Sequence, residues 1–273
     1  MTVVRGQARL ELGAVCAVWH REMLRFTRDR VQLTLALMQP VLLLVVLGIG
    51  LTGVIPHDRL GGSYLTFLFP GVLVMTVVTP ALMTGASLVT DREHGILREM
   101  LLAPVRRESL LIGKCLGGAT VATCQAALLL TLAGLAQIPY HPGVLTQIML
   151  QLTVAALTMA SLGTLFAVTI TSPQAFQAAV GLAAMPMIFL SGAMFPLTHL
   201  PPWLTWTVTV NPISYTVDAV RRITTESLPG PPPALTGLTW AGWHPPILLE
   251  TAINAALGAL LLLIATRRFA RPR

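Results

Sequence analysis

The residues best suited to binding or catalysis lie in one stretch, residues 91–114, which we call the charged segment. It begins Asp91-Arg92-Glu93-His94-Gly95 and ends at Lys114, and its acidic and basic residues alternate. No Asp, Glu, Lys or Arg occurs in residues 60–90 or 115–217. An isolated set of ordered charges indicates a surface that meets water and docks on a partner. The alternative is a solvated connector that its mixed charges keep soluble.

The charged segment also carries apolar residues at helical spacing, among them Leu97 and Leu101. They predict a short amphipathic helix from about Glu93 to Leu102. It ends before Pro104, because the residue before a proline avoids helical geometry. Exposed apolar side chains on such a helix are typical of a partner-binding surface.

A site for ATP is not indicated. A phosphate-binding loop needs Gly-x-x-x-x-Gly-Lys followed by Ser or Thr. The one Gly-Lys pair, Gly113-Lys114, has Glu108 at the position of the first glycine and Cys115 at that of the hydroxyl residue. We therefore expect no cofactor in this chain and Lys114 as an anchor at the end of a span; if ATP and Mg are used, they belong on a separate polypeptide.

No hydrolytic or metal centre is indicated either, because the six histidines are scattered without metal-ligand spacing on one helix.

A transporter driven by an ion gradient usually needs an ionisable residue inside the membrane. The candidates are Glu250 and Asp218. Each is more simply explained as a hydrogen-bonded carboxylate at the membrane interface. Asp218 also lies at helical spacing from Arg221 and Arg222, with either of which it can pair.

The whole chain is too apolar for a soluble fold. Of its 273 residues, 54% are apolar and 11% charged, whereas soluble domains carry about 25% charged residues. We predict an all-α integral membrane protein, because the apolar runs are continuous and do not alternate as in a barrel. The net charge of +7 does not gather in one patch, so no nucleic-acid partner is expected. Three cysteines are too few for a disulfide framework.

Six apolar stretches are long enough to cross a bilayer core, which takes about 20 helical residues. Fifteen of the 18 Lys and Arg residues lie before the first stretch, in the charged segment, or after the last stretch. With six spans these regions share one side, which the positive-inside rule assigns to the cytoplasm. We expect a multi-pass protein of the bacterial plasma (inner) membrane with both termini cytoplasmic. The six predicted spans are Gln32–Ile55, Tyr64–Val89, Leu110–Ile138, Leu145–Ile170, Phe176–Phe195 and Ile247–Thr266.

The arm before the first span, residues 1–31, predicts a basic amphipathic helix. Its apolar residues, including Trp19 and Phe26, share one helical face, and arginines such as Arg21 and Arg25 lie mostly off that face. Such a helix lies in the membrane interface. It is either a polybasic anchor that fixes topology or an elbow that also touches a cytoplasmic partner.

Residues 196–246 do not form a simple span, because they are rich in proline. They also hold four of the five tryptophans, a residue typical of the bilayer interface. We expect an extended loop at residues 228–234 and a helix over Tyr215–Thr225 that dips into or lies along the outer leaflet. The segment is either a gate for an amphipathic solute or a structural cap on the last two spans.

Four motifs occur in order along the chain: Tyr64–Gly71; Asp91–Gly95 with Leu97, Leu101-Leu102, Pro104 and Gly113-Lys114; Leu190–Leu197 with Leu200–Leu204; and Asn211–Tyr215 with Asp218 and Arg221. They resemble the signature segments of ABC-2 type transporter permeases. The resemblance covers nearly the whole chain and is closest to permeases of drug export and of nodulation-factor or capsule export. One departure is Ile96, where many relatives have Thr.

The resemblance implies a permease that pairs with a second copy and with separate nucleotide-binding subunits. It implies that the charged segment is a coupling helix seated in the ATPase, that the N-terminal helix adds contacts, and that re-entrant helices precede the last span. The residues expected to couple to the ATPase are Asp91, Arg92, Glu93, His94, Gly95, Leu97, Arg98, Leu101 and Pro104, with Trp19, Arg21, Arg25 and Phe26 on the interfacial helix. The candidates for an extracytoplasmic gate are Phe195, Pro196, Trp203, Asn211, Pro212, Tyr215, Asp218 and Arg221.

We therefore expect the permease subunit of an ATP-binding-cassette exporter, with a homodimer favoured over a heterodimer. Because the spans hold little charge, the solute is expected to be hydrophobic or amphipathic: a drug, or a lipid or glycan conjugate. The expected organisation is an interfacial helix (1–31), a six-span domain (32–266) with a coupling loop at 90–109, and a basic tail (267–273). The alternatives are an ion-gradient-driven transporter and a membrane scaffold without transport.

Overall fold

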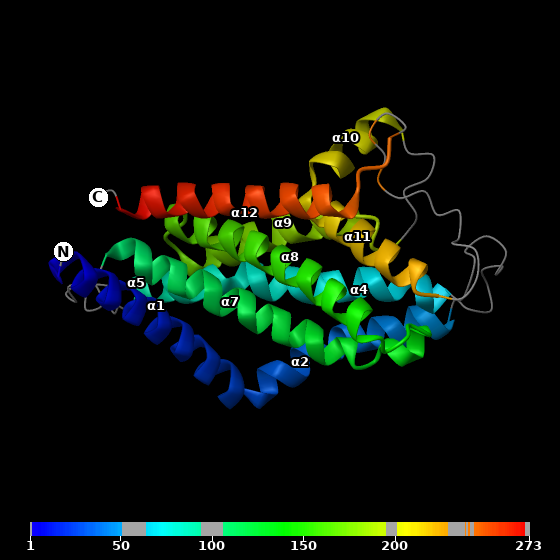
Figure 1. Cartoon of the computed structure of the whole chain (residues 1–273), viewed down its shortest axis with the longest axis horizontal. Helices are drawn as coiled ribbons and strands as arrows, with labels where there is room; N and C mark the ends of the chain where they lie inside the picture. Colours follow the sequence, from blue (N-terminus) through cyan, green and yellow to red (C-terminus); the bar gives the residue numbers. More distant parts are fainter. Residues whose placement is uncertain are drawn as a thin grey trace.

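The computed structural model describes residues 2–50, 64–93, 106–194, 201–228, 238, 240 and 243–270. These residues form a helical bundle (Figure 1). The one β-type pairing among them is a bridge between Trp240 and Trp243, so the all-α prediction is confirmed. The elements are α1 (Thr2–Arg28), α2 (Arg30–Leu43), a π-helical stretch η1 (Leu44–Ile49), α4 (Tyr64–Leu82), a 3-10 turn η2 (Met83–Gly85), α5 (Ala86–Glu93), α7 (Arg107–Leu130), a second 3-10 turn η3 (Ala133–Ala136), α8 (Pro142–Thr169), α9 (Pro173–Phe189), α10 (Pro202–Val210), α11 (Pro212–Glu226) and α12 (Ile247–Ala270).

Four helical stretches within the described residues are long and apolar enough to cross a membrane, and they match the second, third, fourth and sixth predicted spans. A fifth candidate is a pair of helices bent by 69°, which combines α1 with the first predicted span. The chain is thus a multi-pass membrane protein, but the predicted count of six spans is not confirmed. The four stretches are Tyr64–Glu93, Arg107–Leu130, Pro142–Thr169 and Ile247–Ala270.

The fifth predicted span is shorter than expected. α9 has 17 residues, which is about 26 Å at 1.5 Å per residue and less than the roughly 30 Å of a hydrocarbon core. Pro186 lies in its last turn, where it removes a backbone hydrogen bond. The first predicted span differs too, because α2 continues as the π-helical η1 and residues 51–55 lie outside the described ranges.

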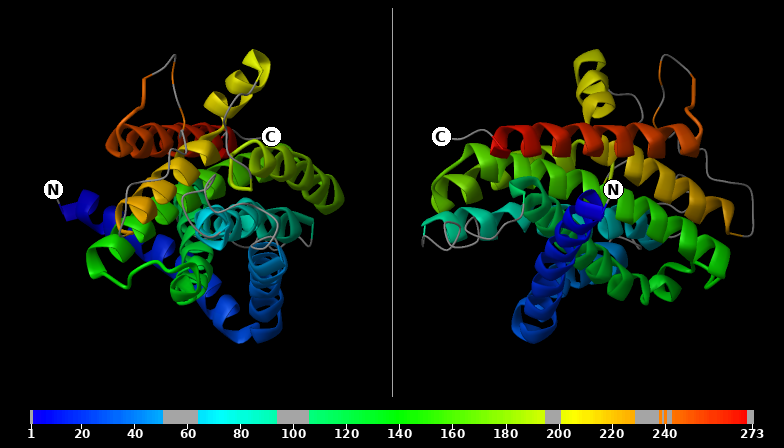
Figure 2. Two further views of the ribbon diagram at one scale, coloured as in Figure 1. Left: turned by 90° about the vertical axis from the view of Figure 1, so that its right-hand side faces the viewer. Right: turned by 60° about the vertical axis from the view of Figure 1, so that its left-hand side comes forward.

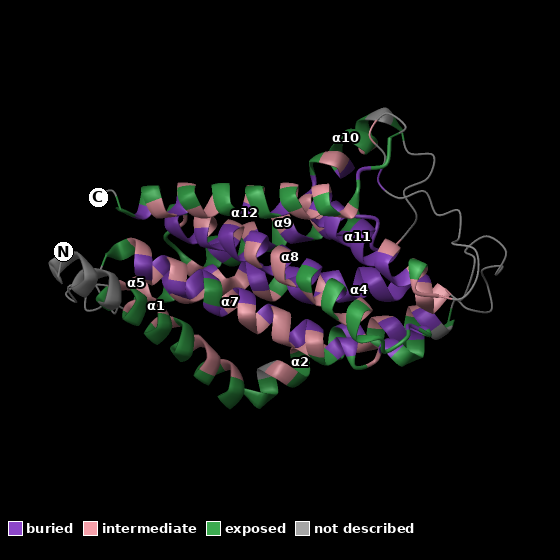
Figure 3. Cartoon of the chain, viewed as in Figure 1, coloured by how far each residue is buried: buried purple, intermediate pink, exposed green. Residues whose placement is uncertain are grey.

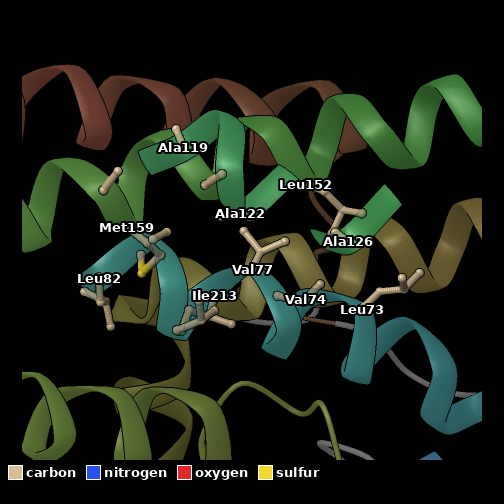
Figure 4. Packing of buried hydrophobic residues seen from close by; sticks show 14 of the residues in the cluster. Leu73, Val74, Val77, Leu82, Ala119, Ala122, Ala126, Leu152, Met159 and Ile213 are labelled. Atoms are coloured by element: carbon tan, nitrogen blue, oxygen red, sulfur yellow. The ribbon is translucent and has the colours of Figure 1, made fainter. Parts of the chain in front are cut away.

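α4 lies at the centre of the bundle and packs against α7, α8 and α11 (Figure 4). Most of its side chains are buried, whereas α2 and α12 keep exposed faces (Figure 3). A Cβ placed on Gly163 of α8 would lie 2.1 Å from the Leu82 carbonyl oxygen. The two backbones therefore touch, as small residues permit at helix contacts in membranes.

The helix formed by α4 and α5 is continuous from Tyr64 to Glu93, with a break in its α-helical hydrogen bonding at the 3-10 turn η2. Pro80 cannot donate the backbone hydrogen bond that an ordinary residue would make to the Thr76 carbonyl, and the 3-10 turn η2 follows before α5 continues to Glu93. A short 3-10 stretch inside a helix often marks a hinge. The break matters because α5 leads directly into residues 94–105 of the charged segment.

Both described ends of the chain lie at one end of the bundle, together with the end of α5 and the start of α7 (Figure 1). α11 and the start of α12 lie toward the opposite end. α1 runs obliquely beside the bundle and turns sharply into α2 (Figure 2). The start of α1, the described ends of the charged segment (91–93 and 106–114) and the described start of the tail (267–270) therefore share one end of the bundle.

Candidate functional sites

The first candidate site is a group of ion pairs formed by Asp91, Lys114 and Arg21, which we call the Asp91 cluster. The Lys114 Nζ lies 2.6 Å from the Asp91 Oδ2, and the Arg21 Nη2 lies 3.3 Å from the same oxygen. Lys114 also donates to the Ser87 Oγ at 2.9 Å. One carboxylate near the end of α5 therefore holds α7 through Lys114 and α1 through Arg21.

Lys114 is the buried member of this cluster. Its side chain is 3% exposed, whereas that of Asp91 is 15% exposed and that of Arg21 is 44% exposed. Lys114, expected to be an anchor at the end of a span, is thus buried near the start of α7 and paired with Asp91. A buried ammonium group needs a nearby anion, because burial alone disfavours its charged form. Asp91 supplies that anion.

α1 packs along α7 at two glycines one helical turn apart, Gly113 and Gly117. A Cβ on either glycine would lie 2.9 Å from a side-chain carbon of α1. The Gly-x-x-x-Gly spacing is typical of close helix contacts in membranes. Trp19 adds a hydrogen bond from its Nε1 to the Thr120 Oγ1 at 3.1 Å. The helix expected to lie in the membrane interface is thus fastened directly to the bundle.

A second group of contacts joins α1 to the start of α7. The Ser109 hydroxyl donates to the Glu11 carboxylate, and the Arg106 Nε lies 3.5 Å from the Glu11 Oε1. The Asp91 cluster precedes residues 94–105, and this second group follows them. α1 therefore holds the charged segment on both sides.

Three of the residues expected to couple to an ATPase are described by the structure. Asp91 belongs to the Asp91 cluster, Arg92 interacts with other parts of the chain, and Glu93 is exposed at the end of α5. The predicted helix Glu93–Leu102 lies outside the described residues beyond its first residue. The remaining expected residues also lie outside them: His94, Gly95, Leu97, Arg98, Leu101 and Pro104.

The second candidate site is built by α11, which carries most of the predicted gate residues. The Asn211 side chain caps this helix by accepting from a backbone amide of the first turn, and its Nδ2 donates to the Met187 carbonyl at 2.6 Å. Pro212 takes the first helical position, where its missing N–H is not needed. The Tyr215 hydroxyl donates to the Thr209 carbonyl at 2.6 Å. These bonds fix α11 against α9 and α10.

α11 is enclosed by other helices. All its residues from Ile213 to Arg221 are buried, and they pack on α4, α8 and α12. Residues 215–225, expected to dip into or lie along the outer leaflet, therefore belong to a helix seated within the bundle. Three charged side chains enter the bundle with it, and each needs a partner there.

Arg222 joins α11 to α12 through two carboxylates, a group that we call the Arg222 cluster. Its Nη2 lies 2.9 Å from the Asp218 Oδ2 and 2.5 Å from the Glu250 Oε1, and its Nη1 donates to the Pro245 carbonyl at 2.9 Å. The predicted pairing of Asp218 with Arg222 is confirmed. Glu250 is 1% exposed, so its carboxylate depends on Arg222 for a counter-charge.

Arg221 points to a different part of the bundle. Its Nη2 donates to the Gly192 carbonyl at 2.8 Å, and its guanidinium carbon lies 4.2 Å from the centre of the Phe67 ring, within the range of a cation–π contact. Arg221 therefore ties α11 to α4.

A polar seam that the sequence did not predict joins α8, α11 and α12. The Asn254 side chain donates from its Nδ2 to the Thr216 Oγ1 at 2.7 Å. The backbone carbonyl of Asn254 accepts from the Thr158 Oγ1 at 2.9 Å. A signal was present in the sequence, because Glu250, Asn254 and Gly258 recur every four residues and are the buried positions in this half of α12. Polar and small residues in this pattern mark the face that packs.

The remaining gate candidates are not gathered around α11. Trp203 lies on α10, which projects away from the bundle (Figure 1), and it is 68% exposed. Phe195 and Pro196 lie outside the described residues. The structure thus brings together Asn211, Pro212 and Tyr215 with Asp218 and Arg221, and leaves Trp203 apart.

Comparison with known proteins agrees with the helical bundle. The sequence profile of the ABC-2 type transporter family matches residues 13–224. The transport permease ycf38 of Porphyra purpurea is 30% identical over 217 residues, covering 76% of this chain and 72% of that protein. YadH, an inner membrane transport permease of Escherichia coli, is 29% identical over 215 residues, covering 76% and 81%. YbhR of Escherichia coli, named as a multidrug ABC transporter permease, is 27% identical over 200 residues, covering 72% and 52%.

The profile match runs from α1 to α11 and includes the whole Asp91 cluster. It also includes Asp218 and Arg222, but ends before Glu250. The apolar helices that are long enough to cross a membrane and the relatives named as transport permeases support the same assignment as the profile. The chain belongs to the ABC-2 type transporter family of membrane permeases.

Proposed function

We propose that this chain is the permease subunit of an ABC exporter in a bacterial plasma membrane, with both termini in the cytoplasm. A separate nucleotide-binding subunit binds ATP and Mg and hydrolyses the ATP, and a second copy of this chain completes the path. The observation that carries the proposal is the attachment of the charged segment to the bundle on both of its sides. The basic residues at that end support a cytoplasmic location.

These attachments explain how the ATPase would move the permease. Asp91 holds α1 and α7 before residues 94–105, and Ser109 holds α1 after them. A push on the charged segment therefore moves α1, α5 and α7 together as a rigid body. The 3-10 turn η2 lets α5 tilt relative to α4. Glu93 and Gly95, with their neighbours, make the contact with the ATPase.

The opposite end supplies the gate. Arg222 links α11 to α12, and Arg221 links α11 to α4, so α11 closes the end of the bundle between them. Tilting of the spans separates these links and opens a path to the outside. Without such a movement, α11 would be a structural cap on the last spans.

A hydrophobic or amphipathic solute fits this interior. The buried charges of the two clusters are engaged with one another, and the remaining core is built mainly from apolar side chains. The solute class that we propose is therefore a drug, or a lipid or glycan conjugate, and not a small ion.

The test is the coupling of ATP hydrolysis to export in vesicles that hold the chain and an ATP-binding subunit that co-purifies with it. Glu93→Ala and Gly95→Pro should insert normally and abolish ATP-driven export of an amphipathic dye. Glu226→Ala, which changes an exposed acidic residue on α11, is the control and should export normally. Normal export by the Glu93 and Gly95 variants would remove the coupling role.

A second candidate, ion-gradient-driven transport, is favoured by the burial of Glu250 beside Asp218 and Arg222. Ionisable groups inside a membrane often form proton paths. Vesicles that hold this chain alone, with an imposed proton gradient and no ATP, distinguish the two candidates. Gradient-driven uptake that Glu250→Gln abolishes would replace the ABC proposal.

A further inference from the structure

Two adjoining cavities lie at the bend between α1 and α2. The first, of about 280 Å³, lies between α1, η2, α5 and α7. The second, of about 240 Å³, lies between α2, α4 and α7. Pro80, Met83 and Gln125 line both, so the cavities meet at the break between α4 and α5. We call the two together the elbow cavity. Their combined volume lies within the range of ligand pockets, which begins at about 300 Å³.

The elbow cavity contains two polar groups without a hydrogen-bond partner in the part of the chain that the structure describes. Gln125 is 5% exposed, lines both cavities, and bonds to none of those residues. The Thr84 Oγ1 is buried, equally unbonded, and borders the first cavity. A buried polar group without a partner lowers stability. The Thr84 hydroxyl is such a group, and the Gln125 amide in the same cavity adds a second point at which a ligand can hydrogen-bond.

The other walls of the elbow cavity are mainly apolar. Phe26 and Leu33 come from the two sides of the bend, and Met75 and Met83 come from α4 and η2. Methionine side chains adapt to ligands of different shape. An apolar pocket with a few polar groups is the usual form of a site for a small organic molecule.

One arginine, Arg25, lines the elbow cavity, and two more line a surface hollow that shares Arg25 with it. Arg25 borders both the first cavity and a surface hollow that also includes Arg21 and Arg28. Two acidic residues, Glu22 and Asp29, also line the first cavity. The Glu22 carboxylate is paired with Arg21, because its Oε1 lies 3.6 Å from the Arg21 Nη2. Arg25 and Arg28 form no salt bridge with the described residues. A guanidinium group without a salt bridge is suited to a carboxylate or phosphate.

We propose that the elbow cavity binds an amphiphile with an anionic head and an apolar body. The head contacts Arg25, the body lies among the methionines, and a polar group on the body bonds to Gln125 and Thr84. The ligand is either a transported solute or a bilayer lipid, which share this chemistry. Its access from the cytoplasmic leaflet rests on the proposed function, whereas the binding itself does not.

The position of the elbow cavity gives a bound ligand a route to the coupling apparatus. Met83 and Thr84 belong to η2, and Ser87, which also lines the first cavity, accepts a hydrogen bond from Lys114. Lys114 is the buried partner of Asp91. Occupancy therefore acts on the turn that joins α4 to α5 and on the Asp91 cluster, and it should stimulate hydrolysis by the partner ATPase.

Photolabelling tests this proposal directly. The full chain in phosphatidylcholine nanodiscs is exposed to a palmitate analogue that carries a diazirine in its chain and a free carboxylate. We expect labelling of peptides from η2 and α7, with a half-saturating concentration about tenfold higher for Gln125→Leu and for Arg25→Gln. The controls are Gln177→Leu, an exposed residue of α9, and Arg267→Gln in α12, which should label as the unchanged chain does.

Folding and binding are separated by the same variants. Gln125→Leu keeps the volume and removes an unbonded polar group, so its unfolding temperature should be unchanged or higher while its labelling falls. Equal labelling of Gln125→Leu and the unchanged chain, or labelling spread evenly over the exposed face of α12, would overturn the proposal. So would equal competition by dodecyltrimethylammonium and by unlabelled palmitate, because the head would then not be recognised as an anion.

The source of the ligand follows from a second lipid composition. If phosphatidylglycerol nanodiscs abolish labelling, the natural ligand is a bilayer lipid. If labelling persists in them, the ligand is a solute that enters from solution. Both results support the site. The assay contains no ATPase, so a failure of the proposed export function would leave its result unchanged.

Discussion

At the scale of single residues, two ion clusters decide where charge is tolerated in an apolar chain. The pairing of Asp218 with Arg222 was predictable, because a separation of four places both on one helical face. The pairing of Asp91 with Lys114 was not, because 23 residues separate them and only the tertiary fold brings the Lys114 ammonium of α7 to the end of α5. Gln125 was missed for a related reason: a sequence does not tell which polar residue will lack a partner.

The Asp91 cluster makes a prediction about stability. Asp91→Leu should lower the free energy of unfolding by about 3 kcal/mol, because Lys114 stays buried without its counter-charge. The double variant Asp91→Leu with Lys114→Met should recover most of that loss, because it removes both charges. Thermal unfolding in detergent measures the difference. Equal losses in the single and double variants would show that the buried pair is not the cause.

The Arg222 cluster makes a matched prediction. Arg222→Leu should cost about 3 kcal/mol of unfolding free energy, because two buried carboxylates lose their shared cation. Glu250→Gln should cost clearly less, because the amide keeps a hydrogen bond to Arg222 and Asp218 remains paired. Unfolding temperatures of the two purified variants check this order. The reverse order would mean that Glu250, and not Arg222, is the centre of the cluster.

At the scale of helices, hydropathy found the elements with continuous apolar runs and misjudged those that depend on packing. α4, α7, α8 and α12 lie close to their predicted positions. α9 ends at Phe189, six residues before the predicted end of the fifth span at Phe195. α11 carries charges that argue for a surface position, yet partners on α12 and α4 allow its burial. Neither partner is near it in sequence, so periodicity alone could not place it.

The contact between α1 and α7 makes a prediction at this scale. Gly117→Leu should push α1 away, because even a Cβ there would lie 2.9 Å from the Glu22 Cβ. Trypsin should then cut faster after Arg21 and Arg25. Gly181→Leu in α9, where nothing lies within 4 Å, should leave the cleavage rate unchanged. Unchanged cleavage of both variants would show that α1 is not held by this contact.

At the scale of the whole molecule, the two ends of the bundle differ in what they present. One end gathers the start of α1, the described ends of the charged segment (91–93 and 106–114) and the C-terminal end of α12, and its ion pairs lie near a surface. The other end seats α11 within the bundle with its ion pairs buried. The positions of the basic residues predicted which segments share the first end, because charge in an apolar chain marks contact with water. The elbow cavity could not be predicted, because it exists only through the bend between α1 and α2.

The central claim is that a separate ATPase drives this bundle through the charged segment. The most direct measurement is ATP-dependent uptake of an amphipathic dye into inverted vesicles that hold the ATP-binding subunit with either the unchanged chain or the Asp91→Leu, Lys114→Met variant. The variant should fold and support ATP hydrolysis, but its dye uptake should fall at least about tenfold, because α5 no longer holds α1 and α7. Uptake by the variant at the unchanged rate, or uptake by the unchanged chain that needs a proton gradient and no ATP, would contradict the claim.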